Sequence, residues 1–252
     1  MPLRFGLTYT QMKLGRAHEH LSQLKDEIAR FCKSKPYTER RYDDTQNARH
    51  IYCVEQKGTP DPIGTLIGEF AYNIRSGLDN LAWQLALLTT DKPNRQTAFP
   101  IESECPGPSN KSFNEKVADI PPDALRVIEA LQPYTRWPAF KEHALWQVNK
   151  LCNLDKHQVI PVSSIDFRIR VDEVSSAGGP AHPNRNTTCI AVPIAEKDQA
   201  KFNVEVAGVV FGEPIDKPQG VSGFELGLDG LSAIYQFVRY DAVPRFEIFF
   251  PK

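Results

Sequence analysis

An acid, an amine and an imidazole stand side by side in the sequence at Asp155, Lys156 and His157. A carboxylate can accept a proton, a lysine ammonium can hold an anion, and an imidazole can exchange protons near neutral pH. These are the residue types of an acid–base or phosphate-binding site. They end an amphipathic segment and precede a short apolar run, so the alternative is that they are only the polar end of a helix.

A helical projection of residues 144–155 places Asp155 in the middle of the apolar face rather than at its edge. A carboxylate that points toward the core loses hydration and faces the negative end of the helix dipole, so it requires a cationic partner. Arg75 borders the apolar stripe of another predicted helix and can turn its guanidinium inward. We therefore expect an ion pair between Arg75 and Asp155, with Asp79 close by, one helical turn after Arg75.

Small and polar residues near the arginine complete the expected cluster. Asn73 or Asn80 can supply hydrogen bonds, and Gly77 lacks the side chain that would hold a neighbouring helix away, at a cost of about 1 kcal/mol of helix stability relative to alanine. The expected cluster consists of Arg75, Asp79, Asn80 and Asp155. It can be a structural ion-pair network that fixes helix register, or it can also bind a ligand or act in a reaction.

Hydrophobic spacing predicts a mostly helical first part of the chain. Apolar residues at helical spacing cover residues 9–35 and 63–89, and the second stripe is wide enough to be buried between neighbours. A polar turn between aromatic and β-branched residues indicates a short hairpin at about 37–56. Further helices begin after Pro122 and at Pro138, and the FPI stretch before them is expected to dock on the core as an apolar plug.

After residue 160 apolar and polar residues alternate, which is the period of half-buried strands. The strands are expected within residues 164–174, 187–196 and 201–213. Residues 228–238 return to helical spacing, so we expect a terminal helix packed on a small antiparallel sheet. The predicted fold is α+β, with a helical bundle domain at residues 1–160 that carries the hairpin and a sheet-plus-helix subdomain at residues 161–252.

The composition is that of an ordinary globular protein, with 41% hydrophobic and 24% charged residues. The formal net charge of -1 provides no general attraction for nucleic acid. Five scattered cysteines without paired spacing indicate reduced thiols and argue against a zinc site. Because neither a signal peptide nor a membrane-spanning run is present, we expect a cytoplasmic protein, with no metal and no cofactor.

The other histidines and cysteines point to no further site. His18 and His20 lie two apart on a predicted helix and so diverge, which argues against a metal site. His143, near a helix start, is expected to be exposed. Cys152 lies on the apolar stripe beside the cluster, where an inert buried thiol is more common than a nucleophile.

Four stretches, taken in order, resemble a widespread group of uncharacterised bacterial helical proteins: NIRSGLDNLAWQL, FPI, IEALQPY and LWQVNKLCNLDKHQVI. Members of that group carry an Arg-Ser-x-Leu-Asp-[His/Asn]-Leu helix and an Asn-x-Asp-Lys-His helix end. The resemblance spans about residues 63–160. The group is in turn distantly similar to HEPN domains, which are helical bundles found in RNA-cleaving toxins and defence systems.

The HEPN resemblance implies a metal-independent ribonuclease, in which an arginine stabilises phosphate charge and a histidine four to six residues later transfers protons. Arg75 fits the arginine, but the histidine position falls at Asn80, which cannot do acid–base work. His157 could substitute only if the helix ends at about Asp155, because His157 otherwise lies roughly 200° around the helix from that residue. Lys156 would then help to hold phosphate.

Two functions therefore remain open on the sequence. The first is a binding or regulatory module in which the cluster of Arg75 and Asp155 organises the core or a ligand pocket. The alternative is a HEPN-like endoribonuclease that uses Arg75 and His157. The partners expected at the cluster are RNA or a small ligand, no membrane association is expected, and the resemblance also implies a homodimer.

Overall fold

The structure, a computed structural model of the 252-residue chain, describes residues 6–57, 61–156, 160, 162–172, 181–184, 187–193, 201–213 and 224–250. The protein is α+β, as the sequence predicts. It divides into two compact units, each assembled from separate stretches of chain. The helical unit comprises Met1–Leu24, Thr65–Ile160 and Asp229–Lys252, and the sheet unit comprises Lys25–Gly64 and Pro161–Leu228.

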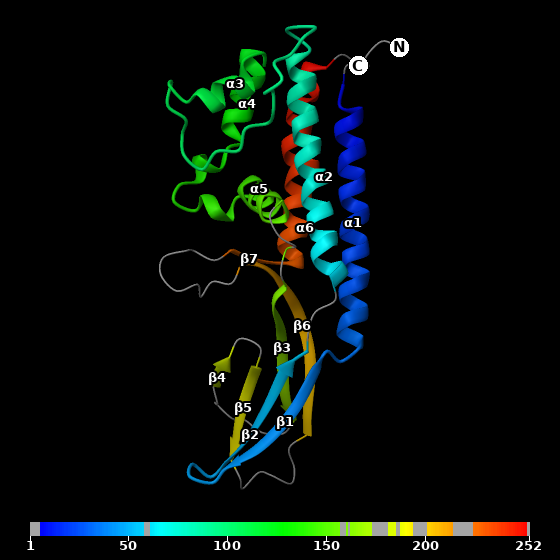
Figure 1. Cartoon of the computed structure of the whole chain (residues 1–252), viewed down its shortest axis with the longest axis vertical. Coiled ribbons are helices and arrows are strands. Elements are labelled where there is room, and N and C mark those ends of the chain that lie inside the picture. The colour runs from blue at the N-terminus through cyan, green and yellow to red at the C-terminus, as the bar shows by residue number, and fades with distance from the viewer. Residues whose placement is uncertain are drawn as a thin grey trace. The chain divides into compact units, whose positions relative to one another are not determined.

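The helical unit is formed by an early, a middle and a late stretch of the chain, in which the first helix is blue, the short middle helices are green and the last helix is red to orange (Figure 1). It contains all or most of the helices α1 (Thr8–Lys33), α2 (Asp61–Ala86), α3 (Lys111–Val117), α4 (Pro122–Ala130), α5 (Ala144–Asp155) and α6 (Leu228–Gln236), while the last turns of α1 and the first turn of α2 belong to the sheet unit. Short 3-10 segments η1 (Pro133–Arg136), η2 (Phe140–Glu142) and η5 (Val243–Phe249) and a π-helical segment η4 (Phe237–Ala242) accompany them. Both ends of α1 and α2 fall within three residues of their predicted positions.

The buried face of α2 forms the centre of the helical unit. Its apolar side chains recur every three or four residues, and the fully buried ones include Ile67, Phe70, Ile74, Leu78, Leu81 and Leu85. This confirms the predicted wide stripe, because a helix with so broad an apolar face has to be covered by several neighbours. α1 is one of these neighbours, since a Cβ atom at Gly77 would lie 3.4 Å from Cβ of Lys13.

The C-terminal segment belongs to the helical unit and not to the sheet unit. The ring of Tyr235 in α6 lies 5.1 Å from that of His18 in α1, and the ring of Phe246 in η5 lies 6.4 Å from that of Phe99. The predicted helix on a small sheet is therefore wrong. Helical spacing shows that a segment has one apolar face, but it does not show which neighbour covers that face.

Two antiparallel sheets lie in the sheet unit, with strand orders β1-β2-β5-β4 and β3-β6-β7. The strands are β1 (Tyr37–Asp44), β2 (Arg49–Gln56), β3 (Val162–Asp172), β4 (Ala181–Asn184), β5 (Thr187–Pro193), β6 (Lys201–Glu213) and β7 (Phe224–Gly227). The hairpin and the three predicted strands are confirmed. β4 and β7 were not predicted, because four residues are too few to show an alternating pattern.

The hairpin is not an insertion in the helical bundle, because residues 25–64 belong to the sheet unit, although the two units do divide after Ile160 as predicted. β2 pairs with β5 from the later part of the chain, with Cys53 opposite Cys189 and Tyr52 opposite Ile190. The free edge of a two-stranded hairpin carries backbone N–H and C=O groups without partners. Pairing with β5 satisfies those groups and places the hairpin in the sheet unit.

Cys32, Cys105 and Cys152 are free thiols, whereas Cys53 is disulfide-bonded. The expectation of reduced thiols throughout is therefore wrong at Cys53. No helix in the described part of the chain is both long enough and apolar enough to cross a bilayer. In the same residues, no three histidine, cysteine or carboxylate side chains are grouped so that they could hold a metal ion.

Candidate functional site

Arg75 and Asp79 form an ion pair one turn apart on α2. Nε and Nη2 of Arg75 donate hydrogen bonds to the two carboxylate oxygens of Asp79, at 3.2 and 2.9 Å. Nη2 also donates to the carbonyl oxygen of Phe99 at 2.7 Å, and Asp79 accepts a hydrogen bond from the Phe99 backbone N–H at 3.0 Å. The pair therefore holds both backbone groups of Phe99, whose ring is fully buried.

Gln132 holds the residues that follow Phe99. Its amide nitrogen donates to the carbonyl oxygens of Pro100 at 2.9 Å and Ile128 at 3.1 Å, and its Oε1 accepts from the backbone N–H of Glu102 at 2.9 Å. Gln132 is fully buried, so these bonds satisfy polar atoms that water cannot reach. The predicted FPI plug is confirmed, and side-chain hydrogen bonds hold it as well as apolar contacts.

Three of the four motif stretches meet at this plug. NIRSGLDNLAWQL supplies Arg75 and Asp79, IEALQPY supplies Gln132, and FPI is the segment that they hold. An extended segment outside a sheet needs other partners for its backbone groups, and these side chains provide them. Holding this segment in place is therefore a sufficient structural role for Arg75, Asp79 and Gln132, and it requires no catalytic activity.

The predicted ion pair between Arg75 and Asp155 is wrong. Arg75 pairs with Asp79, and Asp155 makes no ion pair with any described residue. Asp155 is exposed and not buried, because it is the last residue of α5 and lies where the helix leaves the core. The helical projection predicted the direction in which the side chain points around the helix axis. It did not predict how deeply the end of the helix is buried.

The carboxylate of Asp155 instead lies against α2 at Gly68. A Cβ atom at Gly68 would be 2.0 Å from Oδ1 of Asp155, which no real contact allows. Gly77, the glycine that we expected to permit close helix approach beside the arginine, faces α1. A Cβ atom there would make ordinary contacts, at 3.4 Å with Lys13 and 3.5 Å with the Thr10 carbonyl oxygen.

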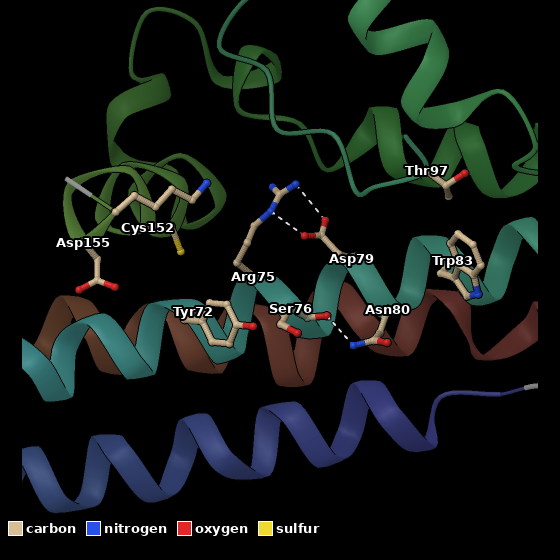
Figure 2. A pocket seen from close by; sticks show the side chains of 10 residues that line it. Tyr72, Arg75, Ser76, Asp79, Asn80, Trp83, Thr97, Cys152 and Asp155 are labelled. Atoms are coloured by element: carbon tan, nitrogen blue, oxygen red, sulfur yellow. Dashed lines mark hydrogen bonds and ion pairs between the residues drawn. The ribbon is translucent and has the colours of Figure 1, made fainter. Parts of the chain in front are cut away.

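The residues of the predicted cluster line the same pocket of the helical unit, which has a volume of about 510 Å³ (Figure 2). The predicted residues on its wall are Arg75, Asp79, Asn80, Asp155 and Lys156. Tyr72, Ser76, Trp83 and Thr97 also line the pocket, although the sequence did not predict them as site residues. Those on α2 recur every three or four positions outside its buried face, so projecting the whole helix could have revealed them.

Arg75 and Thr97 each present a polar atom that has no hydrogen-bond partner in the described structure. Nη1 of Arg75 makes no hydrogen bond, because the bonds to Asp79 and Phe99 use only Nε and Nη2. Oγ1 of Thr97 is buried without a hydrogen-bond partner, and Thr97 is only 9% exposed. A buried hydroxyl without a partner costs free energy, so it marks a position that a ligand atom can satisfy.

Among the described ionisable groups of the pocket, Lys156 is a cation without an ion pair, and Asp155 and Cys152 have raised pKa values. Lys156 is exposed and makes no ion pair with a described residue. Burial of its carboxyl, and then the nearby charge of Glu69, raise the pKa of Asp155. Asp155 is exposed as a whole residue, but its carboxyl is the part that packs on α2. Burial raises the pKa of Cys152 to about 12, which makes its thiol inert at neutral pH.

No imidazole lies on the described wall of the pocket. Asn80, at the position where the resemblance expects histidine, donates to the carbonyl oxygen of Ser76 at 2.8 Å. α5 ends at Asp155 with Lys156 as its C-terminal cap, which is the helix end that a role for His157 requires. His157 itself lies outside the described residues. Arg75 and Lys156 can bind an anion. Proton transfer near neutral pH would need a group that is not among the described residues of the wall.

No family model, curated protein or solved structure matches this chain. The resemblance to the HEPN-like group therefore stays a prediction from four sequence stretches.

Proposed function

We propose that the helical unit is a binding module whose pocket holds a small anionic ligand with a planar or aromatic part. The observation that carries this proposal is the arrangement of Arg75. Asp79 and Phe99 fix its Nε and Nη2, so the guanidinium is oriented in advance while Nη1 is left for a ligand. A donor that is already oriented loses little conformational entropy when it binds.

The charges on the wall favour an anion over a neutral ligand. Asp79 balances Arg75 within their ion pair, whereas no described residue balances Lys156 in this way. Asp155 opposes an anion, but its raised pKa means that its charged form is already disfavoured. A bound anion would raise that pKa further, so binding is expected to strengthen as the pH is lowered toward the range in which Asp155 takes up a proton.

Two aromatic side chains on the wall favour a planar group. Tyr72 is 58% exposed and Trp83 is 37% exposed. Figure 2 shows them along α2 with Ser76 and Asn80 between them. Exposed aromatic faces beside hydrogen-bonding groups can stack on a ring while the polar groups fix its orientation.

Binding can be tested with variants that leave the Arg75–Asp79 pair intact. Thr97→Val removes the unpartnered hydroxyl but keeps the side-chain shape, and Lys156→Gln removes the free charge. Lys92→Gln, at an exposed position that does not line the pocket, is the charge-matched control. The ligands are benzoate, indole carboxylates and nucleoside monophosphates, titrated by calorimetry.

We expect about tenfold weaker binding in Thr97→Val and in Lys156→Gln, in line with about 1.4 kcal/mol for a lost hydrogen bond to a charged ligand. Unfolding midpoints should match the parent in all three variants, and Lys92→Gln should bind like the parent. Equal affinities in all four proteins, or no binding of any ligand of the panel, would refute the proposal.

A metal-independent ribonuclease is the second candidate, and the observation that favours it is the end of α5 at Asp155. Arg75 and Lys156 would hold phosphate, and the aromatic rings would stack on bases. The parent and a His157→Gln variant are incubated with mixed RNA and a chelator. Cleavage that resists the chelator and disappears in His157→Gln would support a nuclease, whereas intact RNA, or cleavage that persists in the variant, would reject it.

A further inference from the structure

A second hollow, of about 560 Å³, lies along one face of α1 and reaches α2 at Asn80. Tyr9 and Met12 line it and are 55% and 62% exposed. Gly15 lines it as well, and a Cβ atom there would meet no atom within 4 Å. The hollow is therefore open at Gly15 and flanked by two large apolar side chains that the described structure leaves uncovered.

The α1 hollow and the Arg75 pocket adjoin each other at two places. Asn80 lines both of them. In addition, the ammonium of Lys13, on the wall of the α1 hollow, lies 5.5 Å from the centre of the Tyr72 ring, on the wall of the Arg75 pocket. The walls of the two hollows therefore meet at Asn80 and at the contact between Lys13 and Tyr72.

The two hollows differ in their chemistry. The Arg75 pocket offers the unused Nη1 of Arg75, the unpartnered hydroxyl of Thr97 and the free charge of Lys156. In the α1 hollow, Arg16 is engaged in an ion pair with Glu19, and the exposed side chains of Tyr9 and Met12 form an apolar wall. One end of the combined site suits an anion and the other suits an apolar group.

We infer that the two hollows form one bipartite site for an amphiphilic anion. The acidic, planar head binds beside Arg75, and the apolar tail lies over Tyr9, Met12 and Gly15. This inference rests on the proposed function for the head group and adds the class of ligand. A tail that leaves water for the α1 hollow gains about fourfold in affinity for each buried methylene, since each contributes about 0.8 kcal/mol.

A series of benzoates tests the tail without changing the head. Benzoate and 4-alkylbenzoates with tails from methyl to octyl are titrated into the full chain by calorimetry. Gly15→Leu fills the α1 hollow from a position where a side chain meets no neighbour, so the fold should tolerate it. Ser22→Leu adds the same side chain at an exposed position of α1 that does not line the hollow, and it is the matched control.

In the parent and in Ser22→Leu, we expect affinity to rise about fourfold per methylene until the hollow is filled. In Gly15→Leu, benzoate should bind as in the parent and the gain with tail length should disappear. Equal affinity for benzoate and its octyl derivative in the parent would overturn the bipartite site, and so would a gain that survives in Gly15→Leu.

The head and the tail can fail separately. If Thr97→Val weakens benzoate but tail length has no effect, the bipartite site is wrong and the Arg75 pocket stands. If long-tailed ligands bind in a way that depends on Gly15 but not on Thr97 or Lys156, the tail site stands and the proposed function of the Arg75 pocket is wrong.

Discussion

The carboxylate of Asp155, at the end of α5, lies so close to the backbone of Gly68 in α2 that a Cβ atom on Gly68 would be 2.0 Å from Oδ1 and 2.5 Å from Cγ. Atoms cannot approach to such distances without a shift of one partner. The missing side chain at Gly68, and not an ion pair with Arg75, is therefore what lets the last turn of α5 lie on α2 beside the pocket.

Gly68→Ala should lower the free energy of unfolding by about 1–3 kcal/mol, because the new methyl group overlaps the Asp155 carboxylate. Asp155→Ala alone should change stability by less than about 0.5 kcal/mol, since the residue as a whole is exposed and has no ionic partner in the described structure. The double variant should be more stable than Gly68→Ala, because the overlap is gone and alanine favours the helix by about 1 kcal/mol over glycine. Urea unfolding of the four proteins measures this coupling.

Gly77→Ala is the matched control for that experiment. Its Cβ atom would make only ordinary contacts, the nearest at 3.4 Å, so the protein should keep its stability or gain up to about 1 kcal/mol. If Gly68→Ala and Gly77→Ala unfold at the same urea concentration, the close contact with Asp155 does not exist in solution.

Asp79→Asn should destabilise the protein by about 2 kcal/mol. The substitution removes the charge that balances Arg75, whose side chain is only 20% exposed, and it weakens the bond to the Phe99 backbone. Asp123→Asn breaks an ion pair with Arg126 in which both side chains are 74% exposed, and it should cost less than about 0.5 kcal/mol. Similar losses in the two variants would contradict the structural role of the Arg75–Asp79 pair.

Gln132→Met should cost about 2–3 kcal/mol, although it keeps the approximate size of the side chain. It leaves the Pro100 carbonyl oxygen and the Glu102 N–H without their partner in a buried place. Hydrogen exchange should show the Glu102 amide exchanging faster in the variant, while amides in the centre of α2 lose only the protection that follows from the lower global stability. Unchanged exchange at Glu102 would argue against the bond.

His143 should make stability depend on pH. The residue is buried, not exposed as expected, and its Nδ1 caps α5 by accepting a hydrogen bond from the Leu145 backbone N–H at 3.2 Å. Burial, and then the charge of Arg136, lower the pKa of His143 from 6.5 to about 4. The folded state thus keeps the imidazole neutral while the unfolded chain protonates, so stability is complete above pH 6.5 and falls by about 3 kcal/mol as the pH drops from 6.5 to 4.

The His143→Asn variant separates this effect from other titrations, because asparagine can still cap the helix but does not titrate. Urea unfolding of both proteins at pH 7.5 and 4.5 gives the comparison. The parent should lose about 2–3 kcal/mol more than the variant between the two pH values. Parallel losses would show that His143 is not held neutral in the fold.

The sequence predicted the elements well where one pattern was long and strong. The stripe of α2 from Ile67 to Leu85 repeats over five turns, and the hairpin has an unmistakable polar turn between two strands. The cluster residues were also found, because an arginine and acids at the border of an apolar face stand out by type. Their partners were not found, because these bonds involve backbone groups. Arg75 binds the backbone carbonyl of Phe99, and Gln132 binds that of Pro100, and such bonds produce no pattern in residue spacing.

The division into units could not be predicted for a related reason. Apolar periodicity shows that α6 and the hairpin each have a side to bury, but it does not say against what. α6 contacts α1 across more than two hundred residues of sequence, as the rings of His18 and Tyr235 show. β2 and β5 likewise pair over a long separation, with Cys53 opposite Cys189.

The order of these stretches has a consequence for biosynthesis. A ribosome that has released the first 160 residues has delivered α1, α2 and α5 but not Val238 and Phe246, which are fully buried in the finished helical unit. The nascent chain therefore carries an incomplete apolar interior until the segment that contains Val238 and Phe246 emerges, a state that favours aggregation and chaperone binding. A shortened gene product ending near residue 160 would be left permanently in that state.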